Sequence, residues 1–372
     1  MEKWQYILIA VFWLLLFTPF ILRDGLTGYD SYAFVNATCQ ETYEHDPAKP
    51  NTAFANVLFE ILPCNMFVFK LLLLLLGLSS LLICCKTGEL LDSTHGWLAG
   101  VFLFLSPLFV QHFVKFENDQ FGTPFIFASF YFLLKAKLSR KNYYRNLGTA
   151  FILLIIAALF WNSAGLVIIG ASLEFVVIFF ASLPIIYYYG KNLFESVASN
   201  PVILENTPGL SFIVVFLLNY GFFAAPMPAL TIFMGLVAFL NGKYAILLLP
   251  LLSFGLINIF KDKFYSKFRN LFIGWAIGIG LATAILGVMI FPPTIDQWNA
   301  VDEAIELHES TGKPIKNLFQ YGYMLDYRGY VAENYGFYEP GYLMDTNGYI
   351  VITFEDINCM KSNEIEPWVY VC

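Results

Sequence analysis

The sequence predicts an all-α, multi-pass membrane protein with about nine transmembrane helices, followed by a small extracytoplasmic α+β domain at its C-terminus. Hydrophobic residues make up 58% of the 372 residues and charged residues only 13%, whereas about a quarter of the residues in soluble domains are charged. Several segments approach the roughly 20 apolar residues that cross a hydrocarbon core. The clearest are Trp4–Leu22, Met66–Cys85, Gly165–Ile186 and Leu271–Phe291.

Charge and parity predict how the transmembrane domain, residues 1–291, is oriented. Its nine predicted spans are Trp4–Leu22, Met66–Cys85, Trp97–Val114, Pro124–Lys135, Leu147–Trp161, Gly165–Ile186, Ser211–Leu240, Lys243–Phe260 and Leu271–Phe291. Residues 135–145 carry five basic side chains and no acidic one, so this loop is expected in the cytoplasm. Residues 292–372 carry thirteen acids against four bases, and the first outer loop, residues 23–64, carries six against two. The amino terminus is therefore expected inside and the carboxyl terminus outside.

Two details of this topology stay open at the level of sequence. Ser211–Leu240 contains Pro226 and Pro228, which either kink one long helix or divide it into two passes. Two passes would change the parity, and the loop 187–210 would then lie on the other side. By contrast, Phe17 to Arg23 lacks the small-residue cleavage site of a secretory signal, so the first span is expected to stay as an anchor.

A small soluble domain is predicted over residues 292–372, where apolar runs become short. Thr294 and Gln297 form a capping-box pattern at the start of a helix, and Gly312 is placed to end that helix. Short strands are expected at Tyr349–Phe354 and Trp368–Val371.

The six cysteines fall into three pairs along the chain. Because disulfides persist in oxidising compartments, the pairs in the predicted outer segments, Cys39 with Cys64 and Cys359 with Cys372, are expected to be bonded. Unpaired small apolar residues are the alternative. The third pair is expected to serve in packing.

Carboxylates gather beside the predicted outer ends of two spans. Asp30 lies in the first outer loop, in the sequence GYDSYAF, and Glu117 and Asp119 follow the third span, in KFENDQFG. Such oxygens are suited to a divalent cation, Mn²⁺ or Mg²⁺, that holds a phosphate-linked leaving group, and one of them could act as general base for an acceptor hydroxyl. Acidic residues that are simply solvated are the alternative.

The arrangement resembles the C-type membrane glycosyltransferases (GT-C), and within them a short relative of the oligosaccharyltransferase catalytic subunit. Asp30 and the Glu117/Asp119 pair match that family's two acidic motifs in type, order and membrane side. FWNSAG, with Trp161, resembles the family's Trp-Gly segment after the fifth span, and NLFQYGYMLDYRG lies where the family has its Trp-Trp-Asp-Tyr-Gly motif. The resemblance implies a lipid-phosphate-linked sugar donor, a metal held by Asp30, Glu117 and Asp119, and an acceptor that is a protein, a lipid or a glycan.

Further candidates follow from these positions. Cations that could neutralise the carrier phosphate are Arg23, Lys115 and Arg328, although each could be an ordinary interfacial anchor. Candidates for the acceptor or substrate pocket are Tyr29, Tyr32, Trp161, Gln320 and Tyr321. The chain departs from the family where Leu318, Phe319 and Gln320 replace the Trp-Trp-Asp part that reads a protein acceptor.

Two other classes of function compete with the enzyme. A transporter would use Glu174, in the middle of the predicted sixth span; Lys70 in the second span could pair with it or snorkel to the interface. A non-catalytic scaffold of a glycosylation complex would keep the soluble domain without needing the carboxylates. Nucleic-acid binding is disfavoured, because the chain has a net charge of −7 and forms no basic polar surface.

Overall fold

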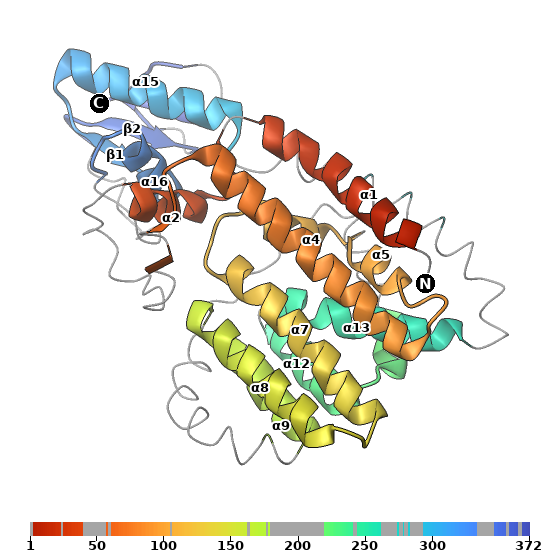
Figure 1. The fold of residues 1–372 in the computed structure, drawn as a ribbon. Coiled ribbons are helices and arrows are strands. Elements are labelled where there is room, and N and C mark those ends of the chain that lie inside the picture. The colour runs from red at the N-terminus through yellow and green to blue at the C-terminus, as the bar shows by residue number, and fades with distance from the viewer. Residues whose placement is uncertain are drawn as a thin grey trace.

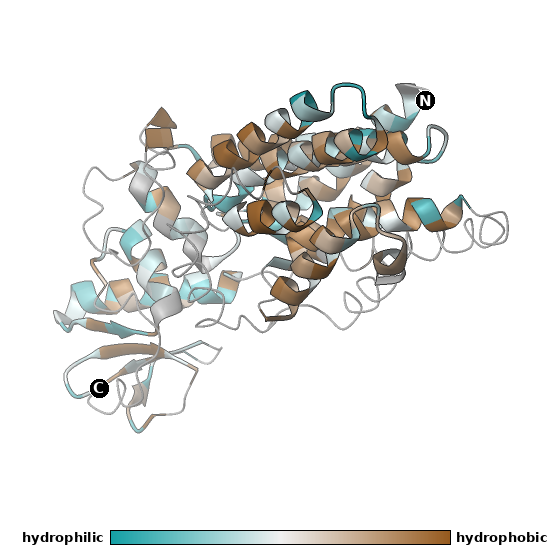
Figure 2. Cartoon of the chain, turned by 90° about the horizontal axis from the view of Figure 1, so that it is seen from below, coloured by the Kyte–Doolittle hydropathy of each residue, from teal (hydrophilic) through white to brown (hydrophobic). Residues whose placement is uncertain are grey.

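A helical bundle carries a small mixed α/β domain at one end, here called the domain end (Figure 1). This computed structural model describes residues 3–23, 25–39, 57–58, 61–104, 106–161, 164–175, 178, 219–240, 244–261, 293–332, 346–354, 357–363 and 367–372, with positions 274, 278 and 282. Brown, apolar ribbon dominates the bundle, and teal is concentrated in the C-terminal domain and the turns (Figure 2).

The first two long helices, α1 (Lys3–Leu22) and α4 (Met66–Leu91), run antiparallel and are held together at both ends. The Tyr6 hydroxyl donates to Glu89 at 2.8 Å, and at the domain end the Lys70 ammonium donates to the carbonyls of Ile21 and Arg23. Lys70 thus satisfies backbone oxygens that the end of α1 leaves open. Between these points the Trp13 ring packs over Gly77, where no side chain intervenes.

The predicted third span is not one helix, and in this respect the sequence prediction was wrong. Two seven-residue helices, α5 (Leu98–Phe104) and α6 (Pro107–Phe113), occupy it. Pro107 has no backbone N–H to continue the preceding helix, and its ring disfavours helical geometry in the residue before it. The chain therefore breaks at Ser106 and starts again, with the proline in the first turn.

Three consecutive antiparallel helices follow: α7 (Asp119–Leu138), α8 (Tyr143–Phe160) and α9 (Ala164–Glu174). Helix α7 starts five residues before the predicted boundary, so that Pro124 lies inside it, and Asp119 suits the positive end of the helix dipole.

In its described part the segment with two prolines is not one continuous helix, and its number of passes stays a prediction. A 3₁₀ helix, η1 (Asn219–Ala224), ends before Pro226, and α12 (Pro228–Leu240) starts after it. Helix α13 (Ala245–Phe260) packs against η1 so closely that Gly221 and Gly255 touch through their backbones. Residues 187–210 and the predicted ninth span, Leu271–Phe291, lie outside the described residues or, at three positions, are described only singly.

Three of the described helices are long and apolar enough to cross a membrane by themselves: Trp4–Leu22, Met66–Leu91 and Tyr143–Phe160. Shorter apolar helices lie beside them at Ala164–Glu174, Pro228–Leu240 and Ala245–Phe260. The protein is therefore an integral membrane protein of helical type. The number of nine spans and the side on which each terminus lies stay predictions.

The C-terminal domain has the mixed helix and strand content that the sequence predicts. Helix α15 (Ile295–Thr311) begins with the predicted capping box of Thr294 and Gln297 and ends at Gly312, which has a φ of 70°. A four-stranded sheet has the order β1-β2-β4-β3, with β1 parallel to β2 and the other pairs antiparallel. The elements that follow α15 are β1 (Ile315–Asn317), α16 (Phe319–Tyr327), β2 (Ile350–Thr353), β3 (Met360–Lys361) and β4 (Trp368–Val371).

Both predicted disulfides are present. The bond between Cys39 and Cys64 joins the end of α2 (Tyr29–Cys39) to the residue before the cap of α4, and Cys359–Cys372 ties the last residue to the sheet domain. The first bond closes the loop between the acidic segment and the membrane bundle.

Replacing Cys64 by serine is expected to lower the free energy of unfolding by about 3 kcal/mol, because the unfolded chain regains the entropy of the opened loop. Thermal unfolding of the purified protein in detergent measures this loss. The double variant Cys39→Ser/Cys64→Ser should lose no more than the single variant; an additive loss would mean that the two thiols act separately.

Candidate active site

The two acidic segments, far apart in the chain, lie side by side at the domain end. Thr27 forms a parallel backbone bridge with Lys115, and its hydroxyl donates to the Val114 carbonyl. The Ser31 hydroxyl accepts the backbone N–H of Phe116 at 2.8 Å and donates to the Thr27 carbonyl at 2.6 Å. These contacts bind the start of α2 to the turn between α6 and α7, which begins 85 residues later.

Glycine makes this approach possible on one side. Gly28 has a φ of 79°, and a Cβ placed on it would lie 3.1 Å from Cγ of Lys115. A side chain at this position would strain the backbone and press on the Lys115 stem. The GYDSYAF segment therefore starts with the one residue type that both requirements favour.

Asp30 lies in this junction by its backbone, in the first turn of α2 and next to Ser31. The side chains of Asp30 and Tyr29 lie outside what the structure describes. The predicted convergence of the two acidic segments is therefore seen in the main chain, and the direction of the Asp30 carboxylate stays a prediction.

The turn that carries Glu117 and Asp119 is buried and internally braced. Glu117 is 7% exposed and Asp119 2%. Gln120 fixes the turn, because its Oε1 accepts the Glu117 N–H at 2.9 Å and its Nε2 donates to the His112 carbonyl at 2.7 Å. Nε2 of His112 lies 2.8 Å from the Thr123 hydroxyl, which connects the histidine to α7.

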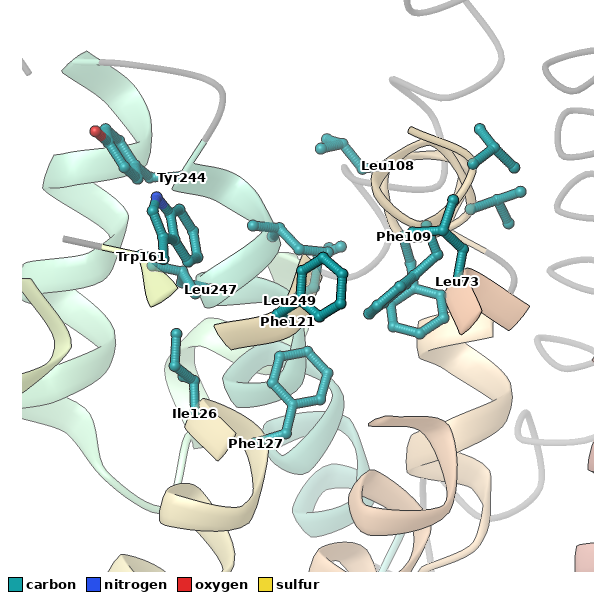
Figure 3. Packing of buried hydrophobic residues seen from close by; sticks show 14 of the residues in the cluster. Leu73, Leu108, Phe109, Phe121, Ile126, Phe127, Trp161, Tyr244, Leu247 and Leu249 are labelled. Carbon is teal, nitrogen blue, oxygen red and sulfur yellow. The ribbon is translucent and has the colours of Figure 1, made fainter. Parts of the chain in front are cut away.

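Apolar and aromatic side chains flank the turn. The Trp161 and Tyr244 rings stack, with centroids 6.2 Å apart and planes inclined by 16°, and Figure 3 shows them at the edge of the cluster that contains Phe121. The ring of His112 lies 6.3 Å from that of Trp161. Trp161, predicted for the substrate pocket, is thus placed beside the acidic turn, although it is only 5% exposed.

The predicted phosphate-binding cations divide into two groups. Lys115 belongs to the junction itself, and Arg23 lies just before it, donating to the Pro293 carbonyl at the entry to the C-terminal domain. Arg328 instead forms a two-point ion pair with Asp302, with nitrogen–oxygen distances of 2.8 and 2.9 Å, and lies over the Trp298 ring.

Two of the predicted pocket tyrosines are fully buried. Tyr32, on α2, packs against Trp298 of the C-terminal domain. The ring of Tyr321 lies 6.1 Å from that of Phe354. Burial raises the pKa of the Tyr32 phenol, so this hydroxyl stays protonated. Gln320 lies on α16, but its side chain lies outside the described residues.

The charge pair expected for a transporter does not form. The Glu174 carboxylate forms an ion pair with Lys137. It also accepts a hydrogen bond from the backbone N–H of Ala229, at the start of α12. Lys70, as described above, binds the end of α1. Of the two roles considered for Lys70, the pairing with Glu174 is not seen, because each side chain has a partner at a helix end.

Several residues of the junction were missed in the sequence. Ser31 and Gln120 hold the two segments through backbone groups, and Tyr244, the residue before α13, lies more than 80 residues beyond Trp161 in the chain. A polar side chain with a backbone partner 85 residues away leaves no local pattern. For Gln120 a weak signal exists, since an amide one turn beyond Glu117 can reach back across it.

Replacing Gln120 by leucine is expected to destabilise the protein by about 1–3 kcal/mol, because the buried Glu117 N–H and His112 carbonyl lose their partner. The same change should also lower the activity of the site. The fraction of activity lost should exceed the fraction of protein that is unfolded at the assay temperature. Thermal unfolding and an activity assay on one preparation separate the two effects. An unchanged unfolding temperature would contradict the bracing role.

Comparison with known proteins relates part of the chain, including the acidic turn but not the Asp30 segment, to a family. Residues 52–203 match the model of the dolichyl-phosphate-mannose-protein mannosyltransferase family, whose members are GT-C membrane glycosyltransferases. The match confirms the resemblance to GT-C enzymes and covers α4 to α9, with the acidic turn and Trp161. It does not extend to the specific likeness to oligosaccharyltransferase. No curated protein matches the chain significantly.

Proposed function

We propose that this protein is a glycosyltransferase that takes a sugar from a polyprenyl-phosphate carrier and transfers it to a hydroxyl-bearing acceptor at the domain end, on the outer face of the membrane. The observation that carries the proposal is the junction of the Asp30 segment with the Glu117/Asp119 turn. Support comes from the family match, which implies a lipid-linked sugar donor in a membrane setting.

The location of the junction suits such a donor. A polyprenyl chain lies in the hydrocarbon region and its phosphate at the interface. Lys115 and Arg23 lie where the helices end, so they can neutralise that phosphate. The stacked Trp161 and Tyr244 rings offer an apolar, rigid flank beside the sugar.

The proposed reaction exchanges one bond at the anomeric carbon. The acceptor oxygen forms the new bond to this carbon, while the bond from the carbon to the carrier phosphate oxygen breaks and its electron pair leaves with the lipid phosphate. A carboxylate, which we assign to Asp30, takes the acceptor proton as general base. Burial of Glu117 and Asp119 strengthens the field of their charges at the reacting atoms.

A divalent cation, Mn²⁺ or Mg²⁺, would bind at Asp30, Glu117 and Asp119 and supply positive charge for the leaving phosphate. No group of three acidic, histidine or cysteine side chains suited to a metal occurs among the residues that the structure describes, which do not include the Asp30 side chain. The metal proposal therefore depends on Asp30 completing the set.

Chelation tests the cation. Treatment with EDTA is expected to abolish transfer by the purified protein, and Mn²⁺ or Mg²⁺ in excess should restore it, because removal leaves buried carboxylates facing an anionic donor. Full activity after chelation, with metal content checked by mass spectrometry, would remove the metal from the proposal and leave the carboxylates.

The test of the function itself is donor consumption. The protein reconstituted in nanodiscs is supplied with a radiolabelled polyprenyl-phosphate-mannose and with candidate peptide, lipid and glycan acceptors. We expect free polyprenyl phosphate to appear in step with a labelled acceptor. A preparation that is folded and binds the donor but never releases polyprenyl phosphate would contradict an enzyme and favour a scaffold.

A further inference from the structure

The C-terminal domain holds α2, the helix that begins with the Asp30 segment, from the side away from the membrane bundle. Helices α2 and α16 pack along their lengths, and the Asn36 amide donates to the Tyr323 carbonyl at 3.3 Å. In Figure 1 the two short helices lie together beneath the sheet and α15. The inward residues of α16, Tyr321, Tyr323, Met324 and Leu325, are each at most 2% exposed.

An aromatic triad connects α2 to the domain at one point. Tyr32 meets Trp298 edge to face at 5.1 Å and Tyr327 at 5.2 Å, and Trp298 meets Tyr327 at 5.9 Å. Rings in these geometries gain attraction beyond their buried area. The triad therefore joins three elements: α2, α15 and the end of α16.

Arg328 closes the outer side of the triad. Its guanidinium lies 4.8 Å from the Trp298 ring centroid and binds Asp302, one turn along α15. A surface ion pair by itself contributes little to stability, but a guanidinium that is both forked to a carboxylate and stacked on a ring fixes the orientation of that ring.

On its inner side the triad reaches the acidic segment. The Tyr32 hydroxyl accepts the Leu26 N–H at 2.8 Å and donates to the Leu26 carbonyl at 3.2 Å. Gly25, with a φ of 70°, leaves room for this hydroxyl, which would lie 2.4 Å from a Cβ there. The chain on both sides of Asp30 is thus tied to one phenol that the domain holds.

We infer that Trp298 is a positioning residue: through Tyr32 it sets the orientation of the helix that carries Asp30, so the C-terminal domain acts as a clamp on the catalytic loop. This inference rests on the proposed function for its catalytic consequence. It also gives α16 a role besides acceptor recognition, since Tyr321, Tyr323 and Met324 of this helix are buried.

The test compares Trp298→Ala with Trp298→Phe, which keeps a ring, and with Trp368→Ala, which removes a tryptophan from β4 of the same domain. We expect Trp298→Ala to speed hydrogen exchange of the α2 amides about tenfold and to lower kcat about 10- to 100-fold with the donor KM little changed, because a shift of about 1 Å in a catalytic group has this effect. Trp298→Phe should recover most of both losses. Trp368→Ala should change neither.

Two outcomes would overturn the clamp: unchanged exchange in α2 for Trp298→Ala, or an equal effect of Trp368→Ala. Where Trp298→Ala also loosens the sheet, Tyr32→Phe decides, since it removes only the hydroxyl and should still speed exchange of the Leu26 N–H. Exchange is measured without substrate, so a wild-type protein inactive in transfer would refute the proposed function while leaving the clamp to be judged by exchange alone.

Discussion

Replacing Asp119 by asparagine is expected to reduce sugar transfer at least about 100-fold, the scale on which a positioned carboxylate contributes to catalysis. Asparagine keeps the shape of the side chain and remains acceptable in the first turn of α7, so the helix should start at the same residue. What is lost is a charge that is 98% shielded from solvent and lies in the turn next to the Asp30 segment. Initial rates with labelled polyprenyl-phosphate-mannose measure the effect.

The matched control is Glu309→Gln, which removes one negative charge from an exposed position near the end of α15. It should transfer at the wild-type rate. An Asp119→Asn variant that inserts and unfolds like wild type but transfers at more than half its rate would exclude this carboxylate from the reaction.

Replacing Gly255 by valine is expected to prevent the membrane bundle from packing correctly, with a loss of about 3 kcal/mol or more. A Cβ at this position would lie 1.7 Å from the carbonyl oxygen of Gly221, and one at Gly221 would lie 1.9 Å from the Leu252 carbonyl oxygen. Both obstacles are backbone atoms, which no change of rotamer can move. Close approach of this kind is what small residues provide between membrane helices.

Gly148→Val separates packing from helix propensity. Gly148 lies on the exposed side of α8, and a Cβ built there has no atom within 4 Å. Both variants exchange glycine for valine within a helix, but only the one at Gly255 should reduce the monodisperse fraction in size-exclusion chromatography and the unfolding temperature. Equal behaviour of the two would mean that η1 and α13 do not meet as described.

Local signals predicted the C-terminal domain well, and the reason is that its elements are set by neighbours in sequence. The capping box at Thr294 and the strand Trp368–Val371 occur where predicted. The spans were predicted less well. Apolar composition locates a membrane segment, but it did not reveal the break at Pro107, because apolar side chains are equally acceptable in both forms, and at Pro226 it left a kink and a break as alternatives.

In the site, too, some features could be predicted from local sequence and others could not. The acidic motifs could be found because they lie beside the predicted outer ends of two spans, and the resemblance to GT-C enzymes in type, order and membrane side predicted that they meet. The contacts that make them meet, such as Ser31 with Phe116, depend on backbone groups that every sequence possesses. For Glu174 and Lys70 the sequence left a pair and separate roles open, and the structure shows each bound at a different helix end.

The proposed role of the domain changes how the family resemblance is understood. In the sequence, α16 takes the place of an acceptor-reading motif without its Trp-Trp-Asp residues. In the fold, that helix faces α2. If the inferred clamp holds, the helix is needed whether or not it reads an acceptor, because it supports the segment that carries Asp30.

The most direct test of the central claim is photo-crosslinking of the wild-type protein in nanodiscs with a polyprenyl-phosphate-sugar that carries a photoreactive group beside its phosphate. If the two acidic segments form one donor site, mass spectrometry should find label both in the peptide around Gly25–Tyr32 and in that around His112–Gln120, and unlabelled donor should suppress both together. Label in other parts of the chain, or in one of these peptides without the other, would contradict a single site at this junction.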